Sequence, residues 1–222
     1  MNEDLTREDV YHAADLLVEE LLEGAGVTRP PVNAIDVAQR HLKMPLREPA
    51  PSAPRGSEEG RQWAAAQAIG ERLKPDLLRR LGFDPASRQG LPGESLAGLL
   101  AHRLLTPTSW FAADARACGR EVPELKNLYA TAGYEVVAWR LLDLPEPCVI
   151  TIVENDHVHG RRSNAWRVNK TLQPAECECQ RYVHHYSRPR VVSADGWTVQ
   201  GWPLHEPDLK RETLRSVGEE VG

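Results

Sequence analysis

The stretch RQWAAAQAIGERL, residues 61–73, has apolar side chains at the spacing expected of an α-helix. Its centre consists of small residues, and Gly70 gives a second helix room to approach closely. Gln67 and Glu71 are four residues apart, so both side chains project from the same face. The stretch therefore predicts a tightly packed helix with a polar face that carries an amide and a carboxylate.

The composition of the chain is that of an ordinary globular protein. Of its 222 residues, 41% are hydrophobic and 27% are charged, which is enough to build a substantial core. The formal net charge of -5 argues against a broad nucleic-acid-binding surface, because phosphate contacts need clustered Lys and Arg. No apolar run approaches the roughly twenty residues of a membrane-spanning helix, and the acidic N-terminal segment is unlike a secretion signal.

The cysteines point to a reducing compartment. There are four of them, and no secretion signal accompanies them: Cys118, Cys148, Cys177 and Cys179. Reduced thiols are a better interpretation than disulfides, since thiols of cytoplasmic proteins are kept reduced. We therefore expect a cytoplasmic protein that contacts neither a membrane nor nucleic acid.

The first two thirds of the chain have helical patterns. The expected helices cover residues 6–24, 33–42, 61–82 and 94–105, and shorter helices follow over 108–144. Thr6 and Asp9 resemble a capping box at the first helix, and Pro107 ends the fourth. Residues 45–60 contain four prolines and predict an extended connection.

The last third of the chain is rich in β-branched and aromatic residues. The expected strands lie within residues 148–155, 157–163, 166–172, 179–187 and 195–204, and residues 206–218 predict a closing helix. The fold class is therefore α+β. It consists of a mostly helical domain, residues 1–145, followed by a small antiparallel β-rich extension, residues 146–222, which ends in a helix.

The order and spacing of several segments resemble the ImmA/IrrE family of metallopeptidase-like proteins. These segments are WAAAQAIGERL (63–73), GESLAGLLAHRLLTP (93–107) and LKNLYATAGYEVVAWRLLDL (125–144), with VNAIDVAQRHLKMPL (32–46) resembling the early helix of the family. The resemblance covers residues from about 30 to 144. It implies a zincin-like helical domain in a bacterial cytoplasmic protein, of a family linked to stress responses or to the regulation of mobile elements.

The resemblance also implies a degenerate HExxH motif. The two metal-binding histidines of the family fall on Gln67 and Glu71, and its catalytic glutamate falls on Ala68. Its third metal ligand falls on Glu94. An amide and two carboxylates offer only oxygen donors, whereas zinc prefers nitrogen and sulfur, and an alanine accepts no proton from a water molecule. We predict a catalytically inactive binding or regulatory scaffold for an unknown protein partner, with no cofactor.

Two other interpretations of these positions stay open. The chain could be a divergent metal-dependent endopeptidase or other hydrolase that uses Glu71 and Glu94, with zinc as its cofactor. Alternatively, Gln67 and Glu71 are ordinary polar helix residues, with Glu71 paired to a neighbour such as Arg72 or Arg103.

A second candidate metal set lies in the β-rich part. It consists of Asp156, His157, His159, Cys177, Cys179, His184 and His185. On strands, His157 would share a face with His159, and Cys177 would share a face with Cys179. The spacing matches no established zinc pattern, in which CxxC pairs are the rule, so exposed histidines and half-buried thiols are the favoured interpretation.

Further features suggest binding surfaces. Residues 124–144 could be taken for a helix-turn-helix, but they present only Trp139 and Arg140 to a groove, so two packing helices are expected. A candidate anion-binding surface consists of Arg161, Arg162, Arg188 and Arg190. A third hypothesis is self-association through Trp197, Trp202 and the expected helix after Pro207.

Overall fold

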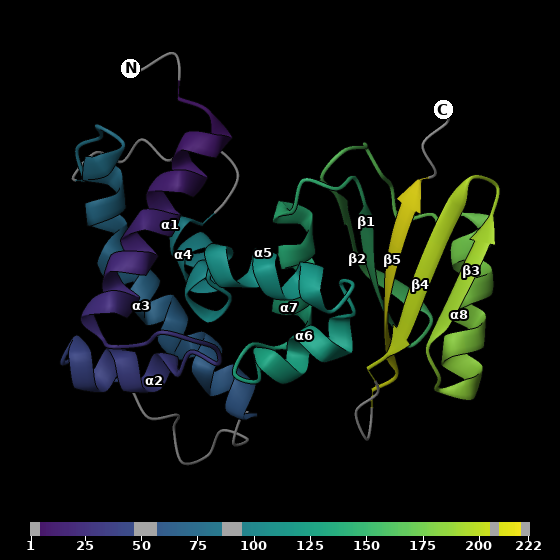
Figure 1. The fold of residues 1–222 in the computed structure, drawn as a ribbon, viewed down its shortest axis with the longest axis horizontal. Coiled ribbons are helices and arrows are strands. Elements are labelled where there is room, and N and C mark those ends of the chain that lie inside the picture. The colour runs from purple at the N-terminus through teal and green to yellow at the C-terminus, as the bar shows by residue number, and fades with distance from the viewer. Residues whose placement is uncertain (1–4, 47–56, 86–94, 205–208, 219–222) are drawn as a thin grey trace. The chain divides into compact units, whose positions relative to one another are not determined.

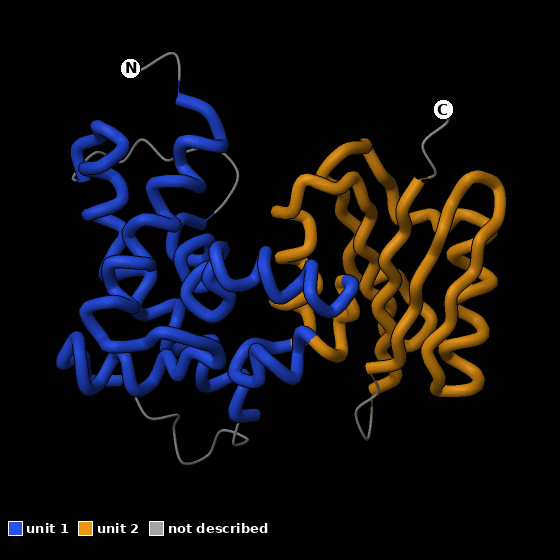
Figure 2. The backbone as a smooth tube through the Cα atoms, viewed as in Figure 1, with its two compact units in different colours: residues 1–119, 125–133 blue, residues 120–124, 134–222 orange. Residues whose placement is uncertain are grey.

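The computed structural model describes residues 5–46, 57–85, 95–204 and 209–218. The chain divides into two compact units: unit 1 comprises residues 1–119 and 125–133, and unit 2 comprises residues 120–124 and 134–222 (Figure 2). Residues 134–145, which the sequence assigned to the helical domain, thus belong to unit 2. Most of the expected Pro-rich connection, residues 45–60, lies outside the described residues.

Unit 1 is built of helices (Figure 1). They are α1 (Arg7–Gly24), α2 (Ala34–Asp36), the π-helical turn η1 (Val37–His41), α3 (Glu58–Arg80), α4 (Leu96–Leu105) and α5 (Thr108–Ala117), while α6 (Val122–Leu128) crosses the boundary between the units. The expected capping box of Thr6 and Asp9 is present, and α4 ends shortly before Pro107. None of the described helices has the length and apolarity to cross a membrane.

A buried glutamine of α3 completes the start of α2. The Oε1 atom of Gln62 accepts hydrogen bonds from the backbone N–H groups of Ala34 at 2.8 Å and Ile35 at 3.4 Å. Its Nε2 atom donates to Oδ1 of Asn33 at 3.1 Å. The first N–H groups of a helix have no partner within the helix, so the glutamine replaces part of a cap.

Helices α3 and α4 approach each other closely at Gly70. A Cβ atom placed on Gly70 would lie 2.3 Å from the carbonyl oxygen of Ala97, well inside van der Waals contact. Only a residue without a side chain fits here, and Ile69 and Leu100 are buried beside the contact. The close helix contact expected at Gly70 is therefore present.

Unit 2 contains a five-stranded antiparallel sheet with the strand order β2-β1-β5-β4-β3. The strands are β1 (Val149–Glu154), β2 (His157–Ser163), β3 (Arg190–Ala194), β4 (Trp197–Pro203) and β5 (Arg211–Gly218). The helices are α7 (Tyr134–Arg140), the 3-10 turn η2 (Leu141–Asp143) and α8 (Pro174–Tyr186), which connects β2 to β3. The α+β class predicted from the sequence is confirmed.

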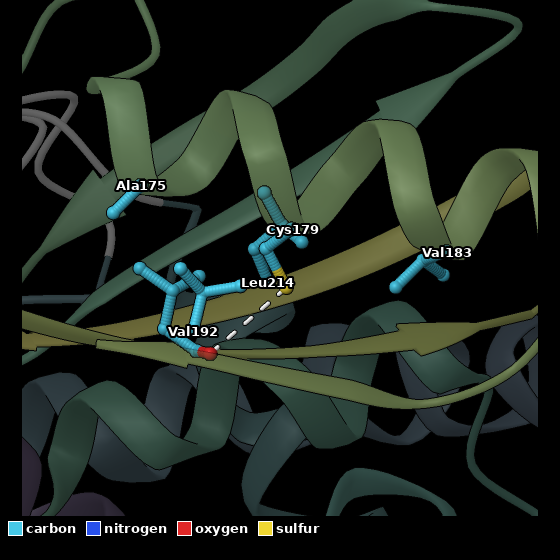
Figure 3. Packing of buried hydrophobic residues seen from close by; sticks show 6 residues of the cluster. Ala175, Cys179, Val183, Val192 and Leu214 are labelled. Atoms are coloured by element: carbon cyan, nitrogen blue, oxygen red, sulfur yellow. Dashed lines mark hydrogen bonds between the residues drawn. The ribbon is translucent and has the colours of Figure 1, made fainter. Parts of the chain in front are cut away.

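Helix α8 covers one face of the sheet, here called the α8 face. Ala175, Cys179 and Val183 follow one another at helical spacing and form a core with strand residues of that face, which include Val192, Val199 and Leu214 (Figure 3). Gly201 of β4 lets the helix approach, since a Cβ there would lie 2.7 Å from the sulfur of Cys179.

The opposite face, here called the α7 face, carries a tryptophan of α7. A Cβ atom on Gly160 would lie 2.8 Å from the ring of Trp139, so the glycine makes room for the indole. The guanidinium of Arg162 lies over the same ring at 4.6 Å from its centroid. Trp139 and Arg140 are only 8% and 3% exposed, so neither is available to read a DNA groove.

Three sequence predictions in unit 2 are wrong. The sequence predicts a strand over residues 179–187, but residues 179–186 belong to α8, whose apolar residues have a helical period that the aromatic content obscured. The expected C-terminal helix, residues 206–218, contains strand β5 instead, which pairs with both β1 and β4. Residues 166–172 form no strand. Self-association through a C-terminal helix is therefore not supported, because residues 211–218 of the expected helix form a strand.

The glycine contact gives the first testable prediction. Gly70→Ala should lower the free energy of unfolding by about 1–3 kcal/mol, because its methyl group would collide with backbone of α4. Urea denaturation measures this change.

Gly98→Ala is the matched control, since a Cβ there meets its nearest atom at an ordinary 3.6 Å. Gly98 lies in the first turn of α4, where this change should be neutral or should stabilise by up to about 1 kcal/mol. Equal effects of the two substitutions would contradict the proposed contact.

Candidate functional site

The face of α3 beside the Gly70 contact carries the sequence-predicted site residues. Gln67 and Ala68 are half-buried, and Glu71 is exposed. The Nε2 atom of Gln67 lies 3.7 Å from the position of a Cβ on Gly98 of α4, so the amide points toward the neighbouring helix. Gln67, Ala68 and Glu71 thus lie on the part of α3 that faces or adjoins α4.

The donor chemistry at this face does not fit a catalytic zinc ion. Gln67 and Glu71 offer oxygen donors only, and zinc sites in proteins are built mainly from imidazole and thiolate. The proposed third ligand, Glu94, lies outside the described residues. Within the described ranges, no group of three or more His, Cys, Asp or Glu side chains is arranged to hold a metal ion.

Arg103, considered above as a partner of Glu71, is bound elsewhere. Its Nε atom lies 2.8 Å from Oδ1 of Asp15, and its guanidinium lies 4.1 Å from the ring centroid of Tyr11. Asp15 also accepts a hydrogen bond from the hydroxyl of Thr108 at 2.6 Å, at the first turn of α5. Arg103 therefore joins α4 to α1, and no described side chain forms an ion pair with Glu71.

The second candidate metal set is separated by the structure. His157 and His159 lie on β2, with exposed side chains, and His159 approaches Glu154 at 3.3 Å. Cys177 and Cys179 lie on α8 rather than on a strand, so two residues of separation turn them to different sides of the helix. Cys177 is half-buried and Cys179 is buried, and both are free thiols.

Cys179 belongs to the core of unit 2. Its thiol donates to the carbonyl oxygen of Arg190 at 3.5 Å. Burial raises the pKa of this thiol to about 12, and the nearby Arg190 only partly offsets that rise. A thiol that stays protonated at neutral pH is neither a nucleophile nor a metal ligand.

Two residues of the same candidate set form a different cluster near the end of α8. The Nδ1 atom of His184 lies 2.8 Å from Oε1 of the buried Glu212 and 3.4 Å from Oδ1 of Asp156. Gln180 donates to the same Asp156 oxygen at 3.1 Å. The cluster ties α8 to β5 and to the turn between β1 and β2.

Unit 2 also contains a buried ion pair between Arg161 of β2 and Glu176 of α8. Their side chains are 4% and 1% exposed, and Nη2 of the arginine donates to both carboxylate oxygens at 3.0 and 2.8 Å. Ser216 of β5 donates to the same carboxylate at 2.7 Å, and the arginine also donates to Thr151 of β1 at 3.2 Å. Charge-assisted bonds of this kind are strong when every donor and acceptor is satisfied.

The expected anion-binding surface is therefore divided. Arg161 is neutralised by Glu176, and Arg162 lies over Trp139. Arg188 and Arg190 stay exposed, with the guanidinium of Arg190 at 4.9 Å from the ring centroid of Tyr182.

A charged cluster on the α7 face was missed by sequence reasoning. Trp202 donates through Nε1 to Glu121 at 2.6 Å, and Arg215 donates to Gln200 at 3.0 Å. Burial raises the pKa of the neighbouring Cys148 thiol, a rise that the Arg215 guanidinium opposes, and burial lowers the pKa of Arg215. Because Glu121 and Trp202 are 81 positions apart in the sequence, no local sequence pattern predicts their hydrogen bond.

Unit 1 has a groove of about 350 Å³ between the end of α1 and the start of α5. It is lined by Glu19, Leu22, Glu23, Val27, Thr28, Pro107, Ser109 and Trp110. The lining thus combines two exposed carboxylates and a half-buried indole with aliphatic side chains.

Comparison with known proteins supports the fold. No protein-family model and no curated protein sequence matches the chain. Among solved structures, the chain is similar to one described as a Mycobacterium tuberculosis transcriptional regulator, with a TM-score of 0.59 and 15% sequence identity. The match covers 93% of this chain and 76% of that chain. At this identity the likeness shows a shared fold, and the resemblance to the ImmA/IrrE family stays a prediction.

The buried ion pair predicts an asymmetric response to substitution. Arg161→Met should lower the free energy of unfolding by about 3–5 kcal/mol, because it leaves the Glu176 carboxylate buried without its cation. Adding Glu176→Met to this variant should recover much of the loss, since two apolar side chains bury no charge. Denaturant titration measures both.

Arg162→Met provides the control from the neighbouring position. This side chain is exposed and lies over Trp139, so its loss should cost no more than about 1 kcal/mol. A loss as large as that of Arg161→Met would contradict the role assigned to the buried pair.

The raised pKa of Cys179 predicts slow alkylation. At pH 8 only about one thiol in 10⁴ would be ionised, so iodoacetamide should modify Cys179 much more slowly than the half-buried Cys177. Both cysteines lie on the tryptic peptide of residues 171–181, so fragment-ion mass spectrometry of this peptide measures both rates, and urea should remove the difference. Equal rates in the folded protein are the contrary result.

Proposed function

We propose that this chain is a catalytically inactive relative of the ImmA/IrrE proteins and serves as a regulatory binding module in the bacterial cytoplasm. The observation that carries the proposal is the composition of the α3 face. The contact at Gly70 is kept, whereas the positions of the metal ligands and of the general base hold Gln67, Glu71 and Ala68. Packing needs a small residue there, but hydrolysis needs a proton acceptor and a suitably bound metal.

The control of transcription is the proposed context. One solved structure that is similar to this chain over 93% of its length is named a transcriptional regulator. Such a regulator needs a module that senses or binds a partner, and this role requires no catalytic chemistry.

The proposed mode of action is protein contact rather than DNA reading. Trp139 and Arg140, the side chains that a helix-turn-helix would present, are buried in unit 2. The net charge of -5 disfavours a phosphate-binding surface. The groove of unit 1, with Glu19, Glu23 and Trp110 in its lining, is a suitable place for a basic or aromatic segment of a partner.

A hydrolase that uses Glu71 and Glu94 with zinc is the competing proposal, and a complementation experiment separates the two. The gene is deleted in the bacterium that encodes it, and transcripts are compared before and after complementation. The double variant Glu71→Ala, Glu94→Ala should restore transcript levels as fully as the natural chain, because neither carboxylate performs chemistry. The purified natural chain, prepared without chelators or nickel, should contain far less than one equivalent of zinc.

Glu8→Ala is the control variant, since it removes an exposed carboxylate from the same unit. Accumulation of each variant is checked by immunoblotting. Stoichiometric zinc that is lost in the double variant, together with failed complementation, would establish the hydrolase. Unchanged transcripts after gene deletion would refute the regulatory role.

A further inference from the structure

The two edges of the sheet in unit 2 differ in their protection. At one edge, β2 has a register shift opposite Ile152 and Val153, and it carries exposed His157 and His159. At the other edge, β3 pairs with β4 without interruption from Arg190 to Ala194. Bulges and charged residues are the usual devices that keep an edge strand from pairing with another chain. The centre of β3 has neither device.

The free side of β3 presents backbone groups in a regular pattern. Asp195 and Gly196, both with positive φ, form a two-residue turn, so Ala194 and Trp197 are a hydrogen-bonded pair. Alternation then points the N–H and C=O groups of Val191 and Ser193 away from β4. These groups are a ready template for a further antiparallel strand.

Exposed apolar side chains flank this edge on both faces. Tyr186 at the end of α8 is 58% exposed and Val191 of β3 is 55% exposed, the two largest values among exposed large hydrophobic residues of the described chain. Val192 packs beneath α8, so Val191 projects from the opposite face. Tyr186 stacks on Tyr182, which in turn contacts the guanidinium of Arg190. The two most exposed of these apolar side chains thus lie near the β3 edge, one on each face.

Charges at the two ends of β3 identify the partner. Arg188 and Arg190 stand at its start and Asp195 follows its end, and all three are exposed. In an antiparallel pair of identical strands the start of one lies beside the end of the other. Each strand therefore complements a copy of itself.

We propose that β3 pairs antiparallel with β3 of a second copy of this chain, about a two-fold axis at Val192. In this register Val191 of each copy lies opposite Ser193 of the other, which allows about four backbone hydrogen bonds. Arg190 lies beside Ala194 of the second copy, within reach of its Asp195. The two sheets become one, with both α8 helices on the same side, because the axis is perpendicular to the sheet.

The pairing reaches beyond the proposed function, since it depends on the edge of unit 2 and not on the face of α3. The proposed pairing is also limited to two copies. Each copy contributes its one β3 edge, and the irregular β2 edge is not expected to pair with a further copy. The expected species is a dimer, not a filament.

Sedimentation velocity of the full chain from about 1 to 200 µM tests the pairing. The natural chain should shift from monomer to dimer over this range. Val191→Lys should raise the dissociation constant at least tenfold, because the two-fold axis brings the two lysines diagonally across from each other, each next in sequence to the charged Arg190. His157→Lys on the β2 edge is the matched control and should leave the dissociation constant unchanged. Thermal melts confirm that each variant is folded.

A charge exchange tests the register. Arg190→Glu and Asp195→Lys should each weaken self-association at least tenfold, because each creates like charges at both ends of the strand pair. A mixture of the two variants should associate again, since every junction then joins opposite charges.

A natural chain that stays monomeric throughout the range would overturn the proposal. A dimer that survives Val191→Lys would assign association to another surface, and a mixture no tighter than its components would exclude this register.

Discussion

In unit 2 the controlling constraint is that the buried charges of Arg161 and Glu176 stay paired. The arginine comes from β2 at one edge of the sheet and the glutamate from α8, while Thr151 of β1 and Ser216 of the central β5 complete the network. Two charges removed from water are tolerated only when their partners are complete, and here this requirement holds Glu176 of α8 against Arg161 of β2. The apolar contacts of Cys179 and Val183 then fill the space that the pair defines.

In unit 1 the controlling constraint is one of size. The approach of α3 to α4 requires that Gly70 lack a side chain, but it places no demand on the chemistry of Gln67 or Glu71. Glu71 is exposed and Gln67 is half-buried, so neither is essential to the core. Catalytic groups at such positions can be replaced without loss of packing. The proposed loss of catalytic groups would therefore change the free energy of unfolding only slightly.

The helices of unit 1 could be predicted because their signals are local. Thr6 with Asp9 and the stop at Pro107 need no information from distant residues. Strand β5 could not be predicted because two residues of its buried face, Glu212 and Ser216, are polar. Their hydrogen-bond partners, His184 and Glu176, lie on α8, far away in the sequence. Hydrophobic alternation, the usual signal of a strand, is absent where a buried face is polar. The strand predicted in place of α8 also affected the candidate metal set. On a strand Cys177 and Cys179 would share a face, whereas on the helix they point to different sides.

The distribution of arginines bears on what kind of partner the protein can have. Arg103, Arg140 and Arg161 are buried and engage carboxylates of their own unit. Arg215 is largely enclosed on the α7 face, where it bonds to Gln200. A guanidinium held in this way cannot approach a phosphate, so these cations add nothing to a surface for nucleic acid. These four internal arginines and the net charge of -5 leave less positive charge for a phosphate-binding surface than the count of 27 Lys and Arg residues suggests, which agrees with the protein contacts proposed above.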